Sequence, residues 1–508
     1  MSNAVEKLWG KIRGSGRLAT IDAATSSPPP SPLAPVDLTD PAQVAAVMNI
    51  AARIGDILLA SGTSNADTRA QIHTVTSSYG LHYCHIDITM NTINMHTSIG
   101  TTQKTPVSVL RVVKTLGLDF SKLSEVDRLI RSIRSGATRP EHAEKILNEI
   151  YLSPPPYGRL MSYLGWGLLG GAVAILFGGD LWMALLGAIT GMLIMIINDW
   201  FGHHDLPYFF QCVLGGLLAT VPAAITYRIA GSIGFSFSPS LVIASGIVVL
   251  LAGLTLVQSL QDGMTGAPVT ASARFFQTML HTGGIVAGVA TGIQLGDVIG
   301  FGLPPLETLA PVPTFSSAVA RIVAGTLATI GFAIASYAEW GAVWVSGATA
   351  VIGSVAFYLM LLPMGASSVL ASAVCATMIG LGGGLLARRF LIPPLITAVA
   401  GVTPLLPGLT VYRGMYAVLN DQMVVGLTNL GIAVATALAL AAGVTLGEWI
   451  ARRIRRPQVI KPYTAFLHAG RITFQQIRRA ERAARTQRAQ LAQRSGQKGR
   501  RGQKPRPH

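Results

Sequence analysis

Helical periodicity first appears between residues 41 and 60, where apolar residues recur three or four positions apart. The recurring residues are Val44, Val47, Ala51, Ile54 and Leu58. Asp40 and Pro41 stand at the start, and an aspartate followed by a proline is typical of the cap and first turn of a helix. The pattern therefore predicts an amphipathic helix over 41–60 that ends before Gly62.

Helical and alternating patterns follow one another up to residue 152. The expected elements are helices at 66–79, 123–135 and 140–151 and strands at 82–89 and 92–98, with 106–113 as a candidate third strand. The strand segments are rich in β-branched residues and alternate between apolar and polar positions. Residues 40–152 are therefore expected to form a small soluble α/β domain, which three prolines at 154–156 separate from the following segment.

Long apolar runs dominate the chain from residue 158 onward. A helix needs about 20 apolar residues to cross the hydrocarbon of a bilayer. Ten runs approach this length, at about 160–178, 181–198, 207–230, 240–260, 272–294, 318–336, 341–360, 366–387, 391–411 and 424–447. The chain is therefore expected to be a polytopic α-helical membrane protein with ten transmembrane helices.

The first five spans superpose on the last five at an offset of 155–156 residues. The tripeptide Gly-Leu-Thr, for example, occurs at 253–255 and again at 408–410. Because five is an odd number, the two units must have opposite orientations across the membrane. The predicted fold is therefore two inverted five-helix repeats, at 158–300 and 315–456, preceded by the small cytoplasmic α/β domain.

The composition agrees with a membrane protein, since 12% of the residues are charged, against about 25% in soluble domains. The excess positive charge lies at one end, because residues 452–508 contain 17 of the 39 Lys and Arg residues and a single acid, Glu481. The basic tail 457–508 is expected to be largely disordered and to contact anionic lipid. It lacks the folded basic face or stacking aromatics that would indicate nucleic-acid binding.

Other chemistry is weakly indicated. Residues 1–39 contain a proline-rich stretch and are expected to be disordered. The three cysteines are isolated, so neither disulfides nor a cysteine metal site is expected, and no cofactor is predicted. His203 and His204 are interpreted as polar loop residues rather than as metal ligands.

Arginines near the span ends predict the orientation. Arg388 and Arg389 precede the ninth span, and an arginine cluster at 452–456 follows the tenth, so both lie on one face of a ten-span protein. The connection from Asp297 to Ser317 has two acids and no Lys or Arg, and it falls on the opposite face. Both termini are therefore expected in the cytoplasm.

Helix-disrupting residues interrupt the ninth span. Pro404 and Pro407 remove backbone donors, and Gly408 lowers the cost of bending. The freed backbone groups need partners in lipid. A polar ligand or ion would supply them, although a kink satisfied by neighbouring helices gives the same pattern. Interrupted spans at matching points of two repeats indicate a transporter binding site, so Pro407 and Gly408 are candidate substrate-binding residues.

Hydroxyl groups and one cation accompany this break. Thr403, Thr410 and Tyr412 bring hydroxyls, and Thr255 brings another in the matching segment of the first half. These four are candidate substrate-binding residues. Arg413 would either clamp a carboxylate in bidentate fashion or extend to the membrane surface, and the sequence leaves both open.

Gln258 and Asp262 are four residues apart and share one helix face. A carboxylate near bilayer depth is by default a proton or substrate-amine site. Asp262 is therefore a candidate proton-coupling residue and Gln258 a candidate substrate-binding one, with a solvated loop position as the alternative for Asp262. Arg274, at the start of the next span, would neutralise that carboxylate. His281 is a second candidate for proton transfer, or a satisfied interior histidine.

Four stretches of the chain resemble the threonine/serine exporters of actinobacteria. They are LSEVDRLIRS at 123–132, GLTLVQSLQDGMTGAP at 253–268, ARRFLIPPL at 387–395 and the run 404–422. The resemblance implies ten spans, a soluble N-terminal domain and efflux of L-threonine and L-serine from the cell, driven by the proton motive force. No nucleophile–histidine arrangement is visible, so an enzyme is not expected.

The sequence is thus interpreted as a secondary exporter in the cytoplasmic membrane that exchanges amino acid for protons. Arg413 would bind the substrate carboxylate, Asp262 the ammonium, and Thr410 or Tyr412 the hydroxyl. Two alternatives stay open. One is an uncoupled channel for small polar metabolites, and the other is a sensor or enzyme domain with a membrane anchor. The oligomeric state, a homo-oligomer included, is also left open.

Overall fold

The computed structural model describes most of the chain between residues 36 and 454. The described residues are Val36, Leu38, 40–99, 105–113, 117–136, 138–233, 238–250, 252–300 and 315–454. Almost all of the N-terminal segment 1–39 and the whole basic tail 457–508 lie outside them. The disorder expected for both segments therefore stays a prediction.

The first two helices begin and end close to where the sequence predicts. α3 (Pro41–Ala60) starts where the Asp40 carboxylate accepts a hydrogen bond of 2.9 Å from the Ala42 N–H. The chain then turns at Gly62, whose φ of +84° is a conformation that favours glycine. α4 (Asn65–Ser78) follows. Both helix predictions are confirmed.

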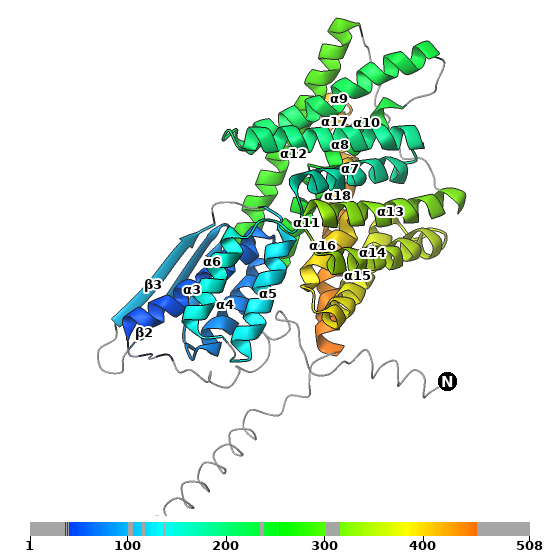
Figure 1. Ribbon diagram of the computed structural model, residues 1–508. Coiled ribbons are helices and arrows are strands. Elements are labelled where there is room, and N and C mark those ends of the chain that lie inside the picture. Colours follow the sequence, from blue (N-terminus) through cyan, green and yellow to red (C-terminus); the bar gives the residue numbers. More distant parts are fainter. Residues whose placement is uncertain are drawn as a thin grey trace, which may run out of the picture. The chain divides into compact units, whose positions relative to one another are not determined.

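A three-stranded antiparallel sheet follows, in the order in which its strands occur along the chain. The strands are β1 (His85–Thr89), β2 (Thr92–Ile99) and β3 (Thr105–Val112), and two helices come next, α5 (Phe120–Arg134) and α6 (Pro140–Leu152). In the register, His85 pairs with His96 and Met95 with Val109. The helices cover one face of the sheet (Figure 1), so buried residues such as Met95 alternate with exposed ones such as His96.

A polar cluster joins α3, β3 and α6. The Arg111 guanidinium donates to the Asp56 carboxylate at 2.6 Å, and the Tyr151 hydroxyl donates to the same oxygen at 2.6 Å. Burial and the hydrogen bond to Asp56 raise the pKa of Tyr151 to about 12. The phenol therefore stays protonated and keeps this donor at physiological pH.

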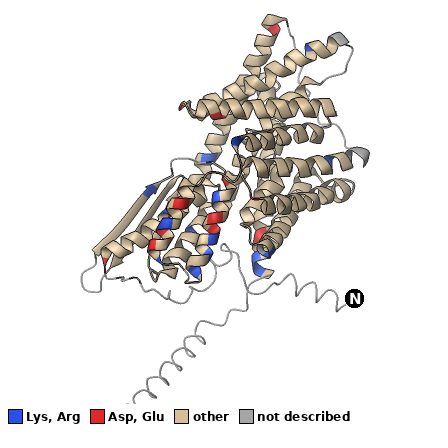
Figure 2. Cartoon of the chain, viewed as in Figure 1, with Lys and Arg blue, Asp and Glu red and all other residues tan. Residues whose placement is uncertain are grey.

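The rest of the described chain folds into long apolar helices. They are α7 (Arg159–Leu176), α8 (Leu181–Gly202), α9 (Tyr208–Ile233), α10 (Pro239–Val248), α11 (Ala252–Met264), α12 (Pro268–Ile299), α13 (Phe315–Ala335), α14 (Trp340–Val355) with its π-helical continuation η1 (Ala356–Leu361), α15 (Ser368–Phe390), α16 (Pro394–Val402) with the short 3₁₀ turn η2 (Thr403–Leu405), α17 (Gly408–Leu419) and α18 (Met423–Ile454). Charged residues gather on the N-terminal elements and at helix ends, and few lie along these helices (Figure 2).

Nine helices of the described residues are long and apolar enough to cross a membrane, or up to eleven if each of two bent pairs forms one span. One of the nine is α3, which the sequence assigns to the N-terminal domain. The protein is therefore a polytopic helical membrane protein. Its number of spans depends on how α3 and the bent pairs are counted.

The apolar helices form two series with the same order of elements. In each series, three helices precede a bent pair, and a helix of 32 residues ends the series. The pair α10–α11 is bent by 46° and the pair α16–α17 by 44°. α12 begins at Pro268 and α18 at Met423, which are 155 residues apart. The first break has no proline, yet its bend nearly equals that of the second.

Glycines let the two series approach closely. A Cβ atom at Gly253, near the start of α11, would lie 2.8 Å from the backbone nitrogen of Gly408, at the start of α17. A Cβ atom at Gly165 in α7 would lie 2.8 Å from the carbonyl oxygen of Gly331 in α13. Small residues permit such backbone contact between membrane helices. The two helix breaks therefore meet each other directly.

The N-terminal elements pack against the ends of the apolar helices. The Phe120 N–H donates to the Ser336 carbonyl at 2.9 Å, and Arg128 forms an ion pair with Glu339. Arg131 donates to the carbonyl of Leu391 at 3.2 Å. These contacts tie α5 to the segments that follow α13 and α15. The domain boundary predicted at residue 152 stays a prediction.

Candidate functional site

A cavity of about 1010 Å³ lies among α7, α8, α9, α11 and α12. Ligand pockets usually measure about 300–1,000 Å³, so this space can admit a small polar molecule. Three predicted residues line it, namely Thr255, Gln258 and His281. The N-terminal elements also contribute to its wall, through Leu59, Ala60, Gly62, Gly117 and Leu118.

Polar residues of the adjacent helices α11 and α12 line this cavity. Those of α12 are Arg274, Gln277, Thr278 and His281, which share one face at helical spacing. Thr278 Oγ1 donates to Thr255 Oγ1 of α11 at 3.0 Å. One turn further along α11, Gln258 Nε2 has no hydrogen-bond partner among the described residues. The His281 ring packs edge-on against Tyr208, with ring centroids 4.6 Å apart.

The end of α8 supplies a further amide. Asn198 is 6% exposed, and its Oδ1 has no hydrogen-bond partner among the described residues. Its neighbour Asp199 is by contrast occupied, since it accepts from the Tyr163 hydroxyl at 2.6 Å and lies 3.5 Å from Arg159. All four side chains line the large cavity. A buried polar atom without a partner next to a cavity is the position that a ligand or water would satisfy.

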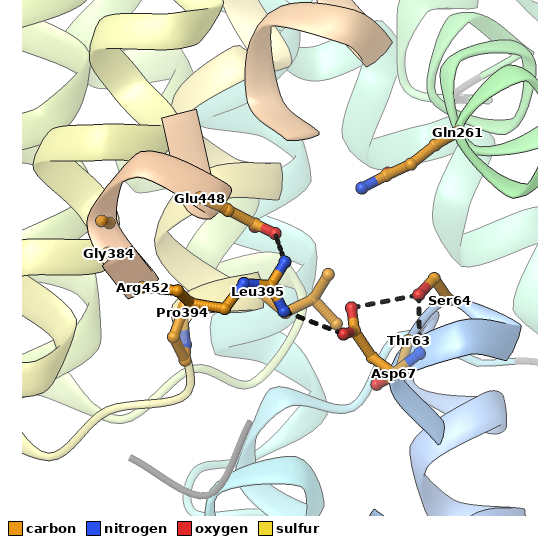
Figure 3. A pocket seen from close by; sticks show the side chains of 10 residues that line it. Thr63, Ser64, Asp67, Gln261, Gly384, Pro394, Leu395, Glu448 and Arg452 are labelled. Carbon is orange, nitrogen blue, oxygen red and sulfur yellow. Dashed lines mark hydrogen bonds and ion pairs between the residues drawn. The ribbon is translucent and has the colours of Figure 1, made fainter. Parts of the chain in front are cut away.

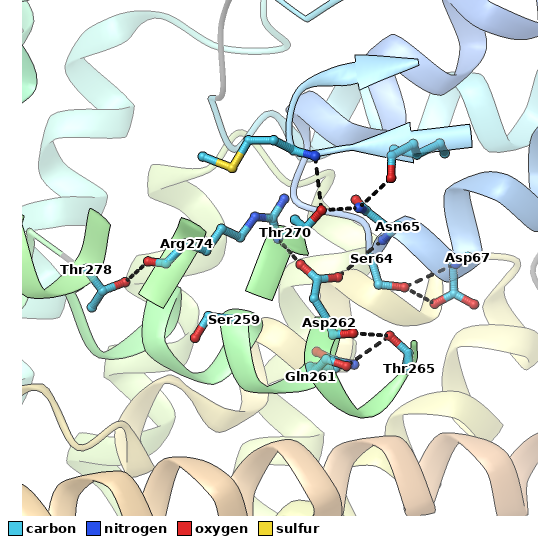
Figure 4. A network of polar contacts seen from close by, with 12 residues as sticks. Ser64, Asn65, Asp67, Ser259, Gln261, Asp262, Thr265, Thr270, Arg274 and Thr278 are labelled. Atoms are coloured by element: carbon cyan, nitrogen blue, oxygen red, sulfur yellow. Dashed lines mark hydrogen bonds and ion pairs between the residues drawn. The ribbon is translucent and has the colours of Figure 1, made fainter. Parts of the chain in front are cut away.

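Asp262 lies behind this polar face, 1% exposed and inside helix α11 rather than in a loop. Arg274 donates to its Oδ2 at 2.7 Å, and the backbone N–H of Asn65 donates to its Oδ1 at 3.3 Å. The Asn65 side chain in turn donates to Thr270 Oγ1 at 2.8 Å (Figure 4). The predicted neutralisation of Asp262 by Arg274 is confirmed. The first turn of α4, nearly 200 positions away in the chain, completes the network.

A second, much smaller cavity of about 40 Å³ lies at the two helix breaks. The predicted residues Thr403, Gly408 and Tyr412 line it, together with Gly253 of the first break and Thr282 of α12. The Tyr412 hydroxyl is buried and has no hydrogen-bond partner among the described residues. A buried water needs about 10–15 Å³ of such space, so this cavity has room for a few waters but not for an amino acid.

Three predicted residues lie outside both cavities. Pro407 is the buried cap residue of α17, while Thr410 and Arg413 are half-buried along that helix. Arg413 lies inside α17, which continues to Leu419. The carboxylate-binding role predicted for Arg413 stays untested.

A third pocket, of about 20 Å³, lies where α4 meets α18. Arg452 stands between Asp67, at 3.1 Å, and Glu448, at 3.5 Å (Figure 3). Ser64 donates to the second oxygen of Asp67 at 3.0 Å. The same first turn of α4 therefore contacts α11 in the first series of helices and α18 in the second.

The sequence left part of the large cavity unassigned. It treated Arg274 only as the neutraliser of Asp262 and did not single out Asn198 or Gln277. A signal was present, because Arg274, Gln277 and two further polar residues repeat at helical spacing in an apolar span. His203 and His204, set aside as loop residues, each hydrogen-bond to a backbone carbonyl one turn earlier.

A multi-pass helical membrane protein with broken helices beside a polar cavity has the architecture of a membrane transporter. A family model described as "Putative threonine/serine exporter" matches residues 49–296, and one described as "Threonine/Serine exporter, ThrE" matches residues 321–450. The chain belongs to the threonine/serine exporter family. It is therefore an amino-acid exporter, a transporter rather than an enzyme.

Two relatives cover most of the chain. A "Threonine/serine exporter" of Corynebacterium glutamicum is 59% identical over 461 residues, which is 91% of this chain and 94% of the relative. A "Probable threonine/serine exporter" of Mycobacterium tuberculosis (strain ATCC 25618 / H37Rv) is 36% identical over 421 residues, 80% of this chain and 77% of the relative. No solved structure matches the chain.

Proposed function

We propose that this protein exports L-threonine and L-serine from the cytoplasm in exchange for protons, as a secondary transporter driven by the proton motive force. The names of both relatives support the two substrates. The carrier mechanism rests on one observation, the direct contact of the two helix breaks at Gly253 and Gly408. Broken helices that meet at a repeat interface form the midplane binding sites of many transporters.

The proposed topology is two inverted repeats of five spans, α7–α12 and α13–α18, each bent pair forming one span. α3 is then part of the N-terminal domain at 40–152 and does not cross the membrane. Gly253 and Gly408 are 155 residues apart, the offset of the repeat, and they touch. Two residues that occupy equivalent positions in the repeats and contact each other lie close to the axis that relates the repeats. Because five spans reverse the chain direction, this axis would lie in the membrane plane.

The two cavities support an alternating-access cycle. In the state described here the large cavity would admit substrate from the side of the N-terminal elements, while the breaks are closed around about 40 Å³. Export would require the breaks to separate. Thr403, Thr410 and the Tyr412 hydroxyl, which has no partner among the described residues, would then contact the substrate, together with the backbone freed at Pro407 and Gly408.

Asp262 is the proposed proton-coupling residue, with His281 as a second candidate. A buried carboxylate within membrane helices is a candidate proton carrier. The charged groups that face Asp262 are Arg274 of α12 and, further away, Asp67 of α4. A proton bound to Asp262 would release Arg274, so the protonation state would set the strength of the ion pair between α11 and α12.

The test uses purified protein in proteoliposomes loaded with labelled L-threonine. An imposed pH gradient, acidic on the side opposite the amino acid, is expected to drive threonine out against its own concentration gradient. Serine is expected to compete. An uncoupled channel could not move threonine uphill, so purely downhill flux would reject the proposal. If Asp262→Asn retains uphill flux, the coupling role of Asp262 is wrong, although export itself would stand.

A further inference from the structure

We propose that the Asp262–Arg274 ion pair is the recognition site for the zwitterionic backbone of the substrate amino acid. Arg274 would bind the α-carboxylate, and Asp262 the α-ammonium. The proposal rests on the export function above and assigns the two backbone charges of the substrate to named residues. It assigns the carboxylate to Arg274, which lines the large cavity, in place of Arg413. Asp262 is not among the lining residues and would be reached through its ion pair with Arg274.

Arg274 has the position and the available hydrogen-bond donors that a carboxylate site requires. Its side chain is 13% exposed and forms part of the wall of the cavity of about 1010 Å³. A guanidinium presents five N–H donors in a planar fork that matches a carboxylate in bidentate fashion. The described residues supply this fork with one acceptor, Asp262 Oδ2, bonded to Nη1. The other donors are available to a carboxylate that enters the cavity.

Asp262 completes the site because a hydrogen bond from Asn65 fixes the orientation of its carboxylate. Its Oδ1 accepts the Asn65 N–H at 3.3 Å, while Oδ2 faces Arg274. When Arg274 turns towards a substrate carboxylate, Asp262 keeps its orientation through Asn65 and presents Oδ2 to the cavity. The first turn of α4 is thus a positioning element for the substrate site.

Charge balance predicts which ligands fit. An isolated buried charge is strongly unfavourable, whereas a paired one is tolerated. A zwitterion inserted between the two side chains gives each of them a new partner of opposite sign. An amino alcohol would leave Arg274 without a partner, and a hydroxy acid would leave Asp262 without one. The site should therefore select amino acids over both kinds of analogue.

The experiment measures counterflow of labelled L-threonine in proteoliposomes, with unlabelled competitors. The competitors are L-threonine, L-threoninol, which lacks the carboxylate, and 3-hydroxybutyrate, which lacks the ammonium. The variants are Asp262→Asn, Arg274→Lys and the double variant Asp262→Asn/Arg274→Gln. The double variant removes both charges and so avoids an orphaned buried charge. Arg228→Gln, an exposed arginine of α9 outside the cavity, is the control.

The double variant is expected to bind L-threonine about 10- to 100-fold more weakly, the loss typical of a charge-assisted hydrogen bond. It should also lose the discrimination between L-threonine and L-threoninol. Asp262→Asn is expected to bring 3-hydroxybutyrate close to L-threonine in affinity, and Arg274→Lys to retain part of the wild-type affinity. The control should match the wild type.

A double variant with wild-type affinity and discrimination would overturn the proposal, because Arg274 would then only neutralise Asp262. That result would leave the export function intact, since wild-type counterflow would be present. Absence of threonine counterflow in the wild type would instead reject the proposed function itself, and this inference with it.

Discussion

At the scale of the residue, Thr270 links the N-terminal elements to α12 through hydrogen bonds. Its Oγ1 accepts both the Asn65 side-chain N–H at 2.8 Å and the Met90 backbone N–H at 3.0 Å, and the residue is 1% exposed. Valine has the same shape but no acceptor. Thr270→Val would leave two donors unsatisfied, at about 1–3 kcal/mol each. We therefore expect a clearly lower melting temperature in detergent, together with weaker threonine transport.

Thr329→Val is the matched control for this substitution. Thr329 is also fully buried, but among the described residues its hydroxyl donates only to the Gly325 carbonyl one turn earlier in α13. That carbonyl belongs to the helix ladder, so the loss of the hydroxyl should change stability little. Equal melting temperatures for the two variants would show that the contacts of Thr270 do not hold α4 to α12.

At the scale of the element, the contact between the two breaks is sterically asymmetric. A Cβ atom at Gly253 would lie 2.8 Å from Gly408 N, whereas a Cβ atom at Gly408 would lie 3.5 Å from Gly253 N. Gly253→Ala must therefore push α11 and α17 apart, and overpacking of this kind costs about 1–3 kcal/mol. Its transport rate is expected to fall well below that of Gly408→Ala, which meets only ordinary van der Waals contact.

Gly382→Ala controls for the loss of a helical glycine as such. No atom of the described residues lies within 4 Å of a Cβ atom placed at Gly382 in α15. This substitution is expected to leave transport unchanged and to favour the helix slightly. Rates measured in the same proteoliposome assay compare the three variants. If Gly253→Ala transports as well as Gly382→Ala, the close approach of the breaks has no role in the cycle.

The two breaks differ in how well the sequence alone predicts them. Pro404 and Pro407 predict the second break, because a proline removes a backbone donor wherever it stands. The first break contains no proline, and Gly253 beside it packs against a segment 155 residues away. Local patterns predicted the helices and strands well, since capping and periodicity act over a few residues. They cannot report a contact between distant segments.

Local patterns likewise could not identify all the residues that line the large cavity. Asp262 was recognisable as a carboxylate near bilayer depth, but its burial arises from Arg274 and from the first turn of α4. The sequence offered Arg413 as the substrate cation because it lies beside the proline break. Only the packing of α11 against α12 directs Arg274 into a cavity, and that packing is a property of the tertiary structure.

At the scale of the whole molecule, the proposed inverted repeat predicts which side of the membrane each turn faces. His204 and Met364 are exposed residues in the turns that join the second and third spans of the two halves. The two turns therefore correspond to each other in the proposed repeats. With ten spans and both termini in the cytoplasm, the turn at His204 faces the cytoplasm and the turn at Met364 faces the outside. Repeats of parallel orientation would put both turns on the same side.

Cysteine labelling in intact cells tests this sidedness. The background is a chain in which Cys84, Cys212 and Cys375 are replaced, so that one introduced cysteine reports alone. Met364→Cys is expected to react with a membrane-impermeant maleimide added to intact cells, and His204→Cys only after the membrane is permeabilised. Retained threonine efflux would show that each variant is folded. Labelling of both positions from the same side would reject the inverted repeat, and labelling of His204→Cys alone would reverse the proposed orientation of the termini.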